Sequence, residues 1–399
     1  MDILHINTAA GWGWANKIAT DLNKELNKKW ISSHLIVNHN RSPLKDISTF
    51  SKKKYDFFSN KLRYIKIKFN ELFGLQDTIY SKYNILVNNK YYQEADIIHF
   101  HNIHGRYFDI RDIEKISNDW KKIIWTLHDT QSITGKCANN LDCEKRLTGC
   151  GKCPYKKLYP KIYLDTTHKF WNIKKEIYSK SNFILTPPSQ WLVDRAKKAP
   201  IMKWKKVKLI YNGIDTNVFK KYEKLKSREK FWLPNNKFIA LFISAGGKSN
   251  IWKWWQYIDK IISEFSNEKD IYFISIWNSK ENEIGNLKEF WFIKDPNILA
   301  QLYSTADVFI YPSLADNCPL VVLEALSCWL PVVSFATGGI PELIEDKKNG
   351  YIAEYMNFQE LKKWVEYFRK NPNSEIKLDE KFKLENMVDN YIKLYNDMI

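Results

Sequence analysis

Short apolar runs alternate with amphipathic segments along almost the whole chain. This alternation is typical of βα units, in which the strands of a parallel sheet are joined by helices that cover its faces. With 399 residues, the chain is too long for one ordinary core and fits two domains of about 200 residues each. We therefore expect an α/β protein with two doubly wound, Rossmann-like domains. A ligand cleft is expected where the carboxyl ends of their strands face each other.

The expected elements form two sets, one in each half of the chain. In the first half the pattern predicts strands at 3–7, 34–37, 97–100, 123–127 and 183–186, and helices at 15–28, 110–117, 167–179 and 190–197. In the second half it predicts strands at 208–210, 239–244, 272–276, 308–311 and 332–335, and helices at 256–265, 298–303, 320–327 and 359–368. Residues 40–90 show no clean period. Because the basic stretch 197–208 contains Pro200, we expect domains at 1–199 and 200–377, followed by a terminal helix at 378–399.

The balance of tryptophan and glycine is unusual, with 16 Trp and only 14 Gly, about half of the usual glycine share of about 7%. Many tryptophans stand in turns that require a positive φ or a close backbone approach, which an indole does not provide. We hypothesise that the natural gene uses UGA as a glycine codon. Under this hypothesis the native residue is glycine at ten positions: Trp12, Trp14, Trp30, Trp204, Trp232, Trp254, Trp277, Trp291, Trp329 and Trp364. The alternative is a natural protein that is rich in tryptophan.

The formal net charge is +17, from 62 Lys and Arg against 45 Asp and Glu. This charge favours an anionic partner such as a nucleic acid, an anionic membrane surface or a phosphorylated substrate. Only 8 of the basic residues are Arg, which nucleic-acid readers use for bidentate contacts, so we expect no nucleic acid partner. No run approaches the roughly 18 apolar residues of a membrane-spanning helix, and Asp2 stands where a signal peptide would be basic. We expect a cytoplasmic protein that binds at most peripherally to the inner face of the membrane.

The strongest local signal lies between residues 311 and 342. Asp316 follows a predicted strand, and Glu324 lies about one and a half turns into the helix that starts at Pro319. A carboxylate at that place can accept hydrogen bonds from the hydroxyls of a ribose. Gly338 and Gly339 precede a further helix and allow backbone N–H groups to approach an anion. An ordinary βαβ unit with a solvated Glu is the alternative.

With these motifs the chain resembles the family-4 retaining glycosyltransferases of the GT-B fold, whose motif of two acids separated by seven residues matches Asp316 and Glu324. The resemblance covers nearly the whole chain. Other matching segments are Tyr211-Asn-Gly-Ile-Asp215, Lys253-Trp254, where the family has Lys-Gly, and the turn Gly11-Trp12-Gly13-Trp14. The segment Trp125-Thr-Leu-His128-Asp129 and the cysteine-rich insert after it are similar to bacterial enzymes that build exopolysaccharides or other surface glycans.

The resemblance implies a role for each matched residue. Glu324 would bind the ribose of a nucleotide-sugar donor, Asp316 would lie near the donor sugar, and His128 would face the reacting sugar across the cleft. Lys253 would neutralise the diphosphate leaving group, and Lys248 stands where the family often has an Arg. A cation and a helix N-terminus can stabilise this group without a metal, so no catalytic cofactor is expected. The donor-binding glycines would be Gly11, Gly13, Gly338 and Gly339.

The expected function is that of a hexosyltransferase, which moves a sugar from a nucleotide diphosphate donor to a hydroxyl acceptor with retention. The acceptor would be a glycan or a lipid-linked glycan in surface polysaccharide synthesis, bound on the side of residues 1–199, while residues 200–377 bind the donor. Two alternatives stay open. The chain could be a nucleotide-sugar epimerase on the same fold, or a non-catalytic basic binding protein.

Four cysteines form a separate cluster with the spacing C-x5-C-x6-C-x2-C: Cys137, Cys143, Cys150 and Cys153. In a reducing compartment disulfides are disfavoured, and four thiolates with a C-x2-C turn suit tetrahedral zinc. One C-x2-C is only half of the stronger pattern, so a structural zinc and a metal-free, partly buried cluster both remain open. No open set of His and carboxylate accompanies the cluster, so we expect no catalytic metal there.

Overall fold

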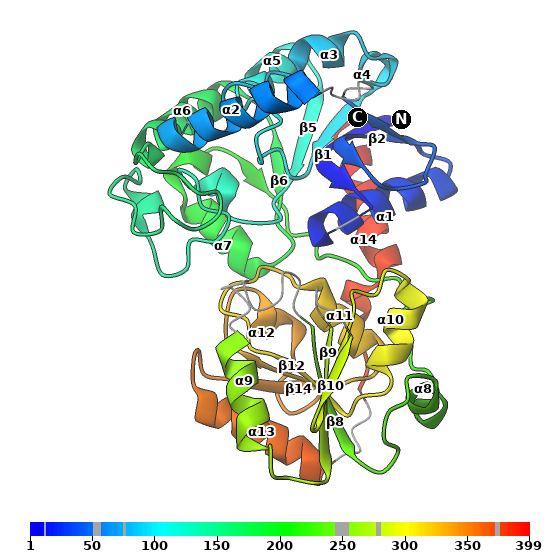
Figure 1. Ribbon diagram of the computed structural model, residues 1–399. Helices are drawn as coiled ribbons and strands as arrows, with labels where there is room; N and C mark the ends of the chain where they lie inside the picture. The colour runs from blue at the N-terminus through cyan, green and yellow to red at the C-terminus, as the bar shows by residue number, and fades with distance from the viewer. Residues whose placement is uncertain (12, 51–56, 75–76, 244–254, 277–280, 372–375) are drawn as a thin grey trace. The chain divides into compact units, whose positions relative to one another are not determined.

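The chain folds into two compact α/β units (Figure 1). The computed structural model describes residues 1–399 except 12, 51–56, 75–76, 244–254, 277–280 and 372–375. Unit 1 comprises Met1–Ile210 and Val388–Ile399, and unit 2 comprises Tyr211–Met387. Each unit contains one seven-stranded sheet. This arrangement confirms the predicted fold class of two doubly wound domains.

Unit 1 has a parallel sheet with the strand order β3-β2-β1-β4-β5-β6-β7. The order reverses beside β1, and ligands of open α/β sheets bind at the carboxyl ends next to such a point. Residues of β1, β4 and β5 are buried on both faces, as parallel strands covered by helices require. The strands are β1 (Asp2–Ala10), β2 (Ser32–Asn40), β3 (Ile47–Thr49), β4 (Ile97–Phe100), β5 (Lys122–Thr126), β6 (Ile184–Thr186) and β7 (Lys206–Val207). The helices are α1 (Trp14–Lys28), α2 (Phe57–Phe73), α3 (Tyr83–Val87), α4 (Lys90–Glu94), α5 (Asp112–Asn118), α6 (Thr167–Lys180) and α7 (Gln190–Lys198).

Unit 2 has the strand order β10-β11-β9-β8-β12-β13-β14, and all pairs are parallel except β10 with β11. Its core lies between the sheet and helices α9 and α13. The strands are β8 (Phe238–Ile243), β9 (Ile271–Ile276), β10 (Asn282–Ile284), β11 (Leu287–Phe290), β12 (Val308–Tyr311), β13 (Val332–Phe335) and β14 (Gly350–Ala353). The helices are α8 (Lys224–Lys230), α9 (Trp255–Glu264), α10 (Pro296–Tyr303), α11 (Leu320–Ser327), α12 (Ile340–Leu343) and α13 (Phe358–Lys370).

The chain returns to unit 1 at its C-terminal end. Helix α14 (Leu384–Asn396) contributes two tyrosines whose hydroxyls reach the core of the first sheet. Tyr391 is 2.6 Å from the Oγ1 of Thr126, and Tyr395 is 2.7 Å from the Nδ1 of His99. Residues 388–399 are therefore part of unit 1 rather than a separate terminal segment.

The structure differs from the sequence prediction at the unit boundaries. The strand predicted at 208–210 in the second domain is wrong, because the short strand there is β7, which pairs with β6 at the edge of the first sheet. Unit 1 consequently runs to Ile210 rather than ending at 199, and unit 2 runs to Met387 rather than to 377. The other predicted strands overlap observed ones.

Four tryptophans adopt a left-handed backbone conformation directly after helices: Trp30, Trp120, Trp232 and Trp329, with φ of 61°, 61°, 55° and 62°. At three of them the two hydrogen bonds of a Schellman motif are present. The N–H of Trp30 donates to Asn27 and the N–H of Ile31 donates to Leu26, with matching pairs beyond α8 and α11. Glycine is the usual residue at this place, since it has no Cβ. Trp120 was not among the ten predicted positions, whereas the other three were.

Candidate functional site

Four histidines gather where β1, β4 and β5 of unit 1 approach their carboxyl ends. His5 on β1 pairs in register with His99 on β4, His101 follows β4, and His128 follows β5. The Nδ1 of His5 lies 3.0 Å from the Nε2 of His101, and the Nδ1 of His101 lies 3.1 Å from the Nε2 of His128. A chain of imidazoles thus runs from the sheet interior to His128, which is partly exposed at the strand end.

These imidazoles are uncharged at neutral pH. Burial lowers the pKa of His5 to about 3 and the pKa of His128 to about 4. Burial also holds the pKa values of His99 and His101 well below the usual histidine value, and the neighbouring imidazoles add to this effect. His128 can therefore exchange hydrogen bonds with a neutral polar ligand, but it does not offer a positive charge to an anion.

Part of this cluster has the composition of a metal site. Within the described ranges, the ligand atoms of His5, His99 and His101 lie within 4.8 Å of one another. Both nitrogens of His99 are already hydrogen bonded, to the hydroxyls of Tyr395 and Thr126 at 2.7 Å each. His101 is likewise bonded through both nitrogens. The Nε2 of His5, in contrast, has no hydrogen-bond partner among the described residues. The nitrogens of His99 and His101 are satisfied as in a hydrogen-bonded core.

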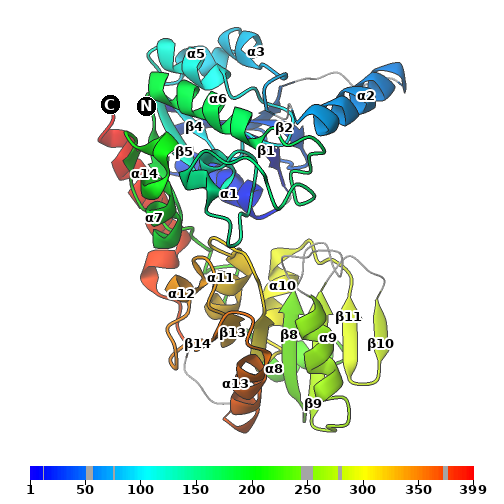
Figure 2. The same ribbon diagram turned by 90° about the vertical axis from the view of Figure 1, so that its left-hand side faces the viewer.

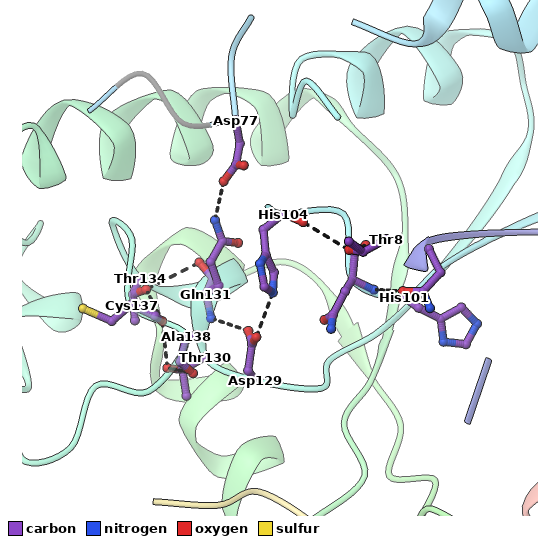
Figure 3. Close-up of polar contacts among 12 residues, drawn as sticks. Thr8, Asp77, His101, His104, Asp129, Thr130, Gln131, Thr134, Cys137 and Ala138 are labelled. Carbon is purple, nitrogen blue, oxygen red and sulfur yellow. Dashed lines mark hydrogen bonds and ion pairs between the residues drawn. The ribbon is translucent and has the colours of Figure 1, made fainter. Parts of the chain in front are cut away.

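A second polar network lies beside the histidines (Figure 3). The Nε2 of His104 is 2.8 Å from the Oδ2 of Asp129, and the N–H of Gln131 donates to the Oδ1 of Asp129 at 2.8 Å. The side-chain amide of Gln131 donates in turn to Asp77 at 2.7 Å. Burial would raise the pKa of Asp129, but His104 and the Gln131 amide outweigh it and lower the pKa. Asp129 is thus held as a carboxylate beside His128.

The two acids of the predicted motif lie in unit 2 around α11. Tyr311 at the end of β12 donates to the Oδ2 of Asp316 at 2.7 Å, and the N–H of Asn317 donates to its Oδ1 at 3.0 Å. Glu324 on α11 is only 3% exposed and accepts a hydrogen bond from the hydroxyl of Tyr303 at 3.0 Å. Both carboxylates are therefore fixed by phenol donors from neighbouring elements.

The predicted glycines are explained by backbone geometry. Gly338 has a φ of 56°, and a Cβ there would lie 1.6 Å from the carbonyl oxygen of Asp316. The N–H of Gly339 donates to the same oxygen at 3.2 Å, so this turn and the Asp316 loop form one unit. At the end of β1, Gly11 has a φ of 83° and its Cβ would lie 2.8 Å from the backbone of Arg41. Gly13, with a φ of 86°, immediately precedes α1.

The predicted site residues fall into three groups. Asp316, Glu324, Gly338 and Gly339 lie in unit 2, where the structure joins Asp316 to the glycine turn, whereas His128 lies in unit 1 with Gly11 and Gly13. Lys248 and Lys253 lie outside the described residues, as do Trp12, Trp254 and Trp277. The four cysteines of the insert line one cavity of unit 1.

The side chains that form hydrogen bonds to the site residues were not predicted from the sequence. Tyr303 precedes Glu324 by 21 positions, a separation that no motif records. Asp77 lies in the segment 40–90, where no period was visible. Tyr311 begins the segment between residues 311 and 342, and its position at a strand end could have suggested a contact with Asp316.

A family model matches part of unit 2, and individual relatives match most of the chain. Residues 278–385 match the family model of glycosyl transferases group 1, a range that includes Asp316, Glu324 and both glycines of the turn. The chain is 23% identical over 366 residues to the Escherichia coli protein assigned to colanic acid biosynthesis as the glycosyl transferase WcaC, covering 89% of this chain and 88% of that protein.

Solved structures match over the full length. Sucrose-phosphate synthase from Thermosynechococcus elongatus superposes with a TM-score of 0.67 at 15% identity, covering 100% of this chain and 98% of that one. HepE from Anabaena in complex with UDP superposes with a TM-score of 0.64 at 14% identity, covering 100% of both chains. The chain has the GT-B fold. Within the described parts of this GT-B chain, no helix combines the length and apolarity that crossing a membrane requires.

Proposed function

We propose that the protein is a glycosyltransferase that moves a hexose-type sugar from a nucleotide diphosphate donor to a hydroxyl of a glycan or lipid-linked acceptor in surface polysaccharide synthesis. One observation carries the proposal: Asp316 and the Gly338 turn form one hydrogen-bonded unit, and the buried Glu324 is held by Tyr303, inside the segment that matches glycosyl transferases group 1. Similarity to a colanic acid glycosyl transferase and to a GT-B structure that holds UDP supports it.

In this proposal unit 2 binds the donor. A carboxylate offers only acceptors, so a buried Glu324 suits the two hydroxyls of a ribose, while the hydroxyl of Tyr303 keeps it oriented. Asp316 would lie near the donor sugar. Lys248 and Lys253 would meet the negative charge that develops on the diphosphate as it leaves.

The proposed reaction replaces one glycosidic bond by another. The bond between the anomeric carbon and the diphosphate oxygen breaks, a bond to the acceptor oxygen forms, and the acceptor proton is released with the nucleoside diphosphate. By resemblance the configuration is retained. His128 would hydrogen bond the reacting sugar as a neutral imidazole, because burial lowers its pKa to about 4.

Nucleotide binding tests the donor site directly. We expect UDP, GDP or ADP to raise the melting temperature of the protein, and Glu324→Gln to weaken the affinity at least tenfold. Glu345→Gln is the matched control, since Glu345 is exposed and pairs with Lys348 away from α11. Equal affinity in both variants would overturn the assignment of Glu324.

Product analysis tests the reaction. Incubation with nucleotide sugars and glycan acceptors should give a new glycoside whose anomeric configuration equals that of the donor. Release of an altered nucleotide sugar without any acceptor would instead favour an epimerase. Tight, steeply salt-dependent binding of nucleic acid without donor turnover would favour a basic binding protein.

We also propose that unit 1 meets an anionic membrane surface through α2, where a lipid-linked acceptor would lie. Apolar side chains of α2 recur at helical spacing and are exposed: Leu62, Ile65, Phe69, Leu72 and Phe73. The helix also contains four basic residues against Glu71 alone. Figure 2 shows α2 extending outward from the rest of unit 1. An apolar stripe flanked by positive charge is typical of helices that lie in a lipid interface.

Vesicle binding tests this surface. Protein should bind vesicles of phosphatidylglycerol more strongly than vesicles of phosphatidylcholine, and Ile65→Ser should reduce that binding severalfold. Ile85→Ser is the control, because Ile85 is similarly exposed on α3. If Ile65→Ser and Ile85→Ser bind alike, α2 is not the membrane contact.

We further propose that glycine is the native residue at the predicted tryptophan positions and at Trp120. The left-handed φ at the four helix ends supports this hypothesis, because an L-residue there costs about 1–2 kcal/mol. Their indoles are 41% to 96% exposed. In contrast, Trp125 and Trp171 are buried and donate their indole N–H to carbonyls of His101 and Arg146 at 3.0 and 2.9 Å, as ordinary core tryptophans do.

Not all of the predicted tryptophan positions lie at helix ends. Trp364 lies inside α13 and stacks on Tyr351 with ring centroids 3.8 Å apart, so its backbone has no need of glycine. Mass spectrometry of the protein from its natural host decides each position separately. Glycine at Trp30, Trp120, Trp232 and Trp329 is expected, and an intact tryptophan at these four positions would end the hypothesis. Reverting Trp254 to Gly should then strengthen donor binding.

A further inference from the structure

We propose that Cys137, Cys143, Cys150 and Cys153 bind one structural zinc ion in unit 1. They lie in the insert that follows β5 and line one small cavity together. All four are free thiols, with no disulfide among them. Zinc prefers this ligand set, four sulfurs in a tetrahedral arrangement, for sites that stabilise irregular chain segments.

The backbone of the insert is shaped to present the thiols to the cavity. Cys150, Gly151 and Lys152 have successive positive φ values of 58°, 84° and 44°, a turn that carries both cysteines of the C-x2-C pair. The N–H of Gly135 donates to the Sγ of Cys150 at 3.2 Å, and amide donors of this kind stabilise a thiolate. The N–H of Cys153 donates to the Oδ2 of Asp165 at 2.5 Å, which fixes the second cysteine of the pair.

The charges around the cavity point to a negatively charged occupant. Arg146 is 3% exposed and lines the same cavity, and its Nε and Nη1 have no hydrogen-bond partner among the described residues. Lys174 is 1% exposed, and its ammonium group donates to the carbonyls of Gln131 and Thr134 at the start of the insert. A zinc ion with four thiolates has a net charge of −2. Arg146 is already paired with Glu144 through its Nη2. Lys174 and the buried Lys136, which lines the cavity, are therefore the cations that would balance this charge.

The four sulfurs are not arranged as a zinc tetrahedron in this structure. Among the described residues the one group with three ligand atoms within 4.8 Å of each other is the histidine cluster, so the sulfurs stand further apart than in a zinc tetrahedron. Zinc–sulfur bonds of about 2.3 Å would draw them together. Metal binding should therefore make the segment 134–167 more rigid than it is with free thiols.

Metal analysis of the full-length protein tests the site. After desalting, we expect one zinc per chain for the unchanged protein and for Cys328→Ala, the control with a buried cysteine in unit 2. Cys150→Ser should lower the zinc content at least tenfold. Zinc far below one per chain in the unchanged protein, or a disulfide between any two of the four cysteines, would overturn the proposal.

A second measurement covers the case in which Cys150→Ser does not fold. Cobalt(II) added to the unchanged, zinc-stripped protein should give the absorption bands of tetrahedral thiolate coordination, and hydrogen exchange in residues 134–167 should slow. Rapid reaction of these four thiols in the presence of zinc would contradict the site, whereas the buried Cys318 and Cys328 should react slowly in either case. The result does not depend on the proposed transferase activity, because neither readout involves a sugar donor.

Discussion

The two units have sheets of the same size but opposite chemistry at the carboxyl ends of their strands. All eight histidines of the chain lie within Met1–Ile210, and none lies in Tyr211–Met387. Unit 1 buries neutral imidazoles bonded to one another, whereas unit 2 holds the carboxylates of Asp316 and Glu324 with tyrosine hydroxyls. The fold decides where functional groups gather, and the residues placed there decide what they bind.

Low pH should produce the largest difference in stability between the two units. The pKa values of His5, His99 and His101 are depressed in the folded state, so the unfolded chain binds more protons as the pH falls below about 6.5. Their contribution to stability is complete above that pH and falls by about 1.4 kcal/mol per pH unit for each group until the folded pKa is reached. Hydrogen exchange of the whole protein at pH 7 and pH 5, corrected for intrinsic rates, should show unit 1 losing protection first. An equal loss of protection in unit 2 would contradict the predicted difference between the units.

Removing the exposed end of the imidazole chain should have the next largest effect. We expect His128→Asn to lower kcat for sugar transfer roughly 100-fold, the order expected for a group that acts in the transition state. Donor affinity should stay near its original value, because the proposed donor site lies in unit 2. His168→Asn is the control, since His168 lies on α6 and bonds the carbonyl of Gly149. A change confined to donor affinity would argue against the proposed division of roles.

Tyr303→Phe probes the carboxylate side of the comparison. The ring remains, but Glu324 loses the hydroxyl that donates to it, which should reduce stability or donor affinity by about 1–3 kcal/mol. Tyr257→Phe serves as control, because its hydroxyl bonds a backbone carbonyl on another face of unit 2. Thermal unfolding and donor titration of both variants measure the difference. Identical results would mean that the phenol does not fix Glu324.

The smallest expected effect should be equal in both units. Trp30→Gly in unit 1 and Trp232→Gly in unit 2 should each raise stability by about 1 kcal/mol, because glycine relieves a left-handed backbone without removing a buried contact. Trp125→Gly should lower stability by several kcal/mol instead, since it opens a cavity in the core. Denaturant unfolding of the three variants checks the signs. A loss of stability in both glycine variants would count against the helix-end argument.

The sequence predicted those parts of the fold that local pattern determines. Buried parallel strands such as β4 and β12 form apolar runs, and the spacing of Asp316 and Glu324 placed both acids around one helix. The hairpin β10–β11 was missed because its residues are largely polar and exposed. Contacts that join distant segments were also beyond reach, such as the bond of Tyr303 to Glu324 or the packing of α14 on the first sheet. Such contacts depend on tertiary structure, which cannot be predicted from a short stretch of sequence.

The return of α14 to unit 1 makes unit 2 an insertion in the topological sense. During synthesis residues 388–399 leave the ribosome after all of unit 2, so His99 and Thr126 receive their tyrosine partners last. The first half of the chain consequently completes its core only after unit 2 has been synthesised. Removing residues 388–399 should therefore destabilise unit 1 more than unit 2, although unit 2 precedes these residues directly in the sequence.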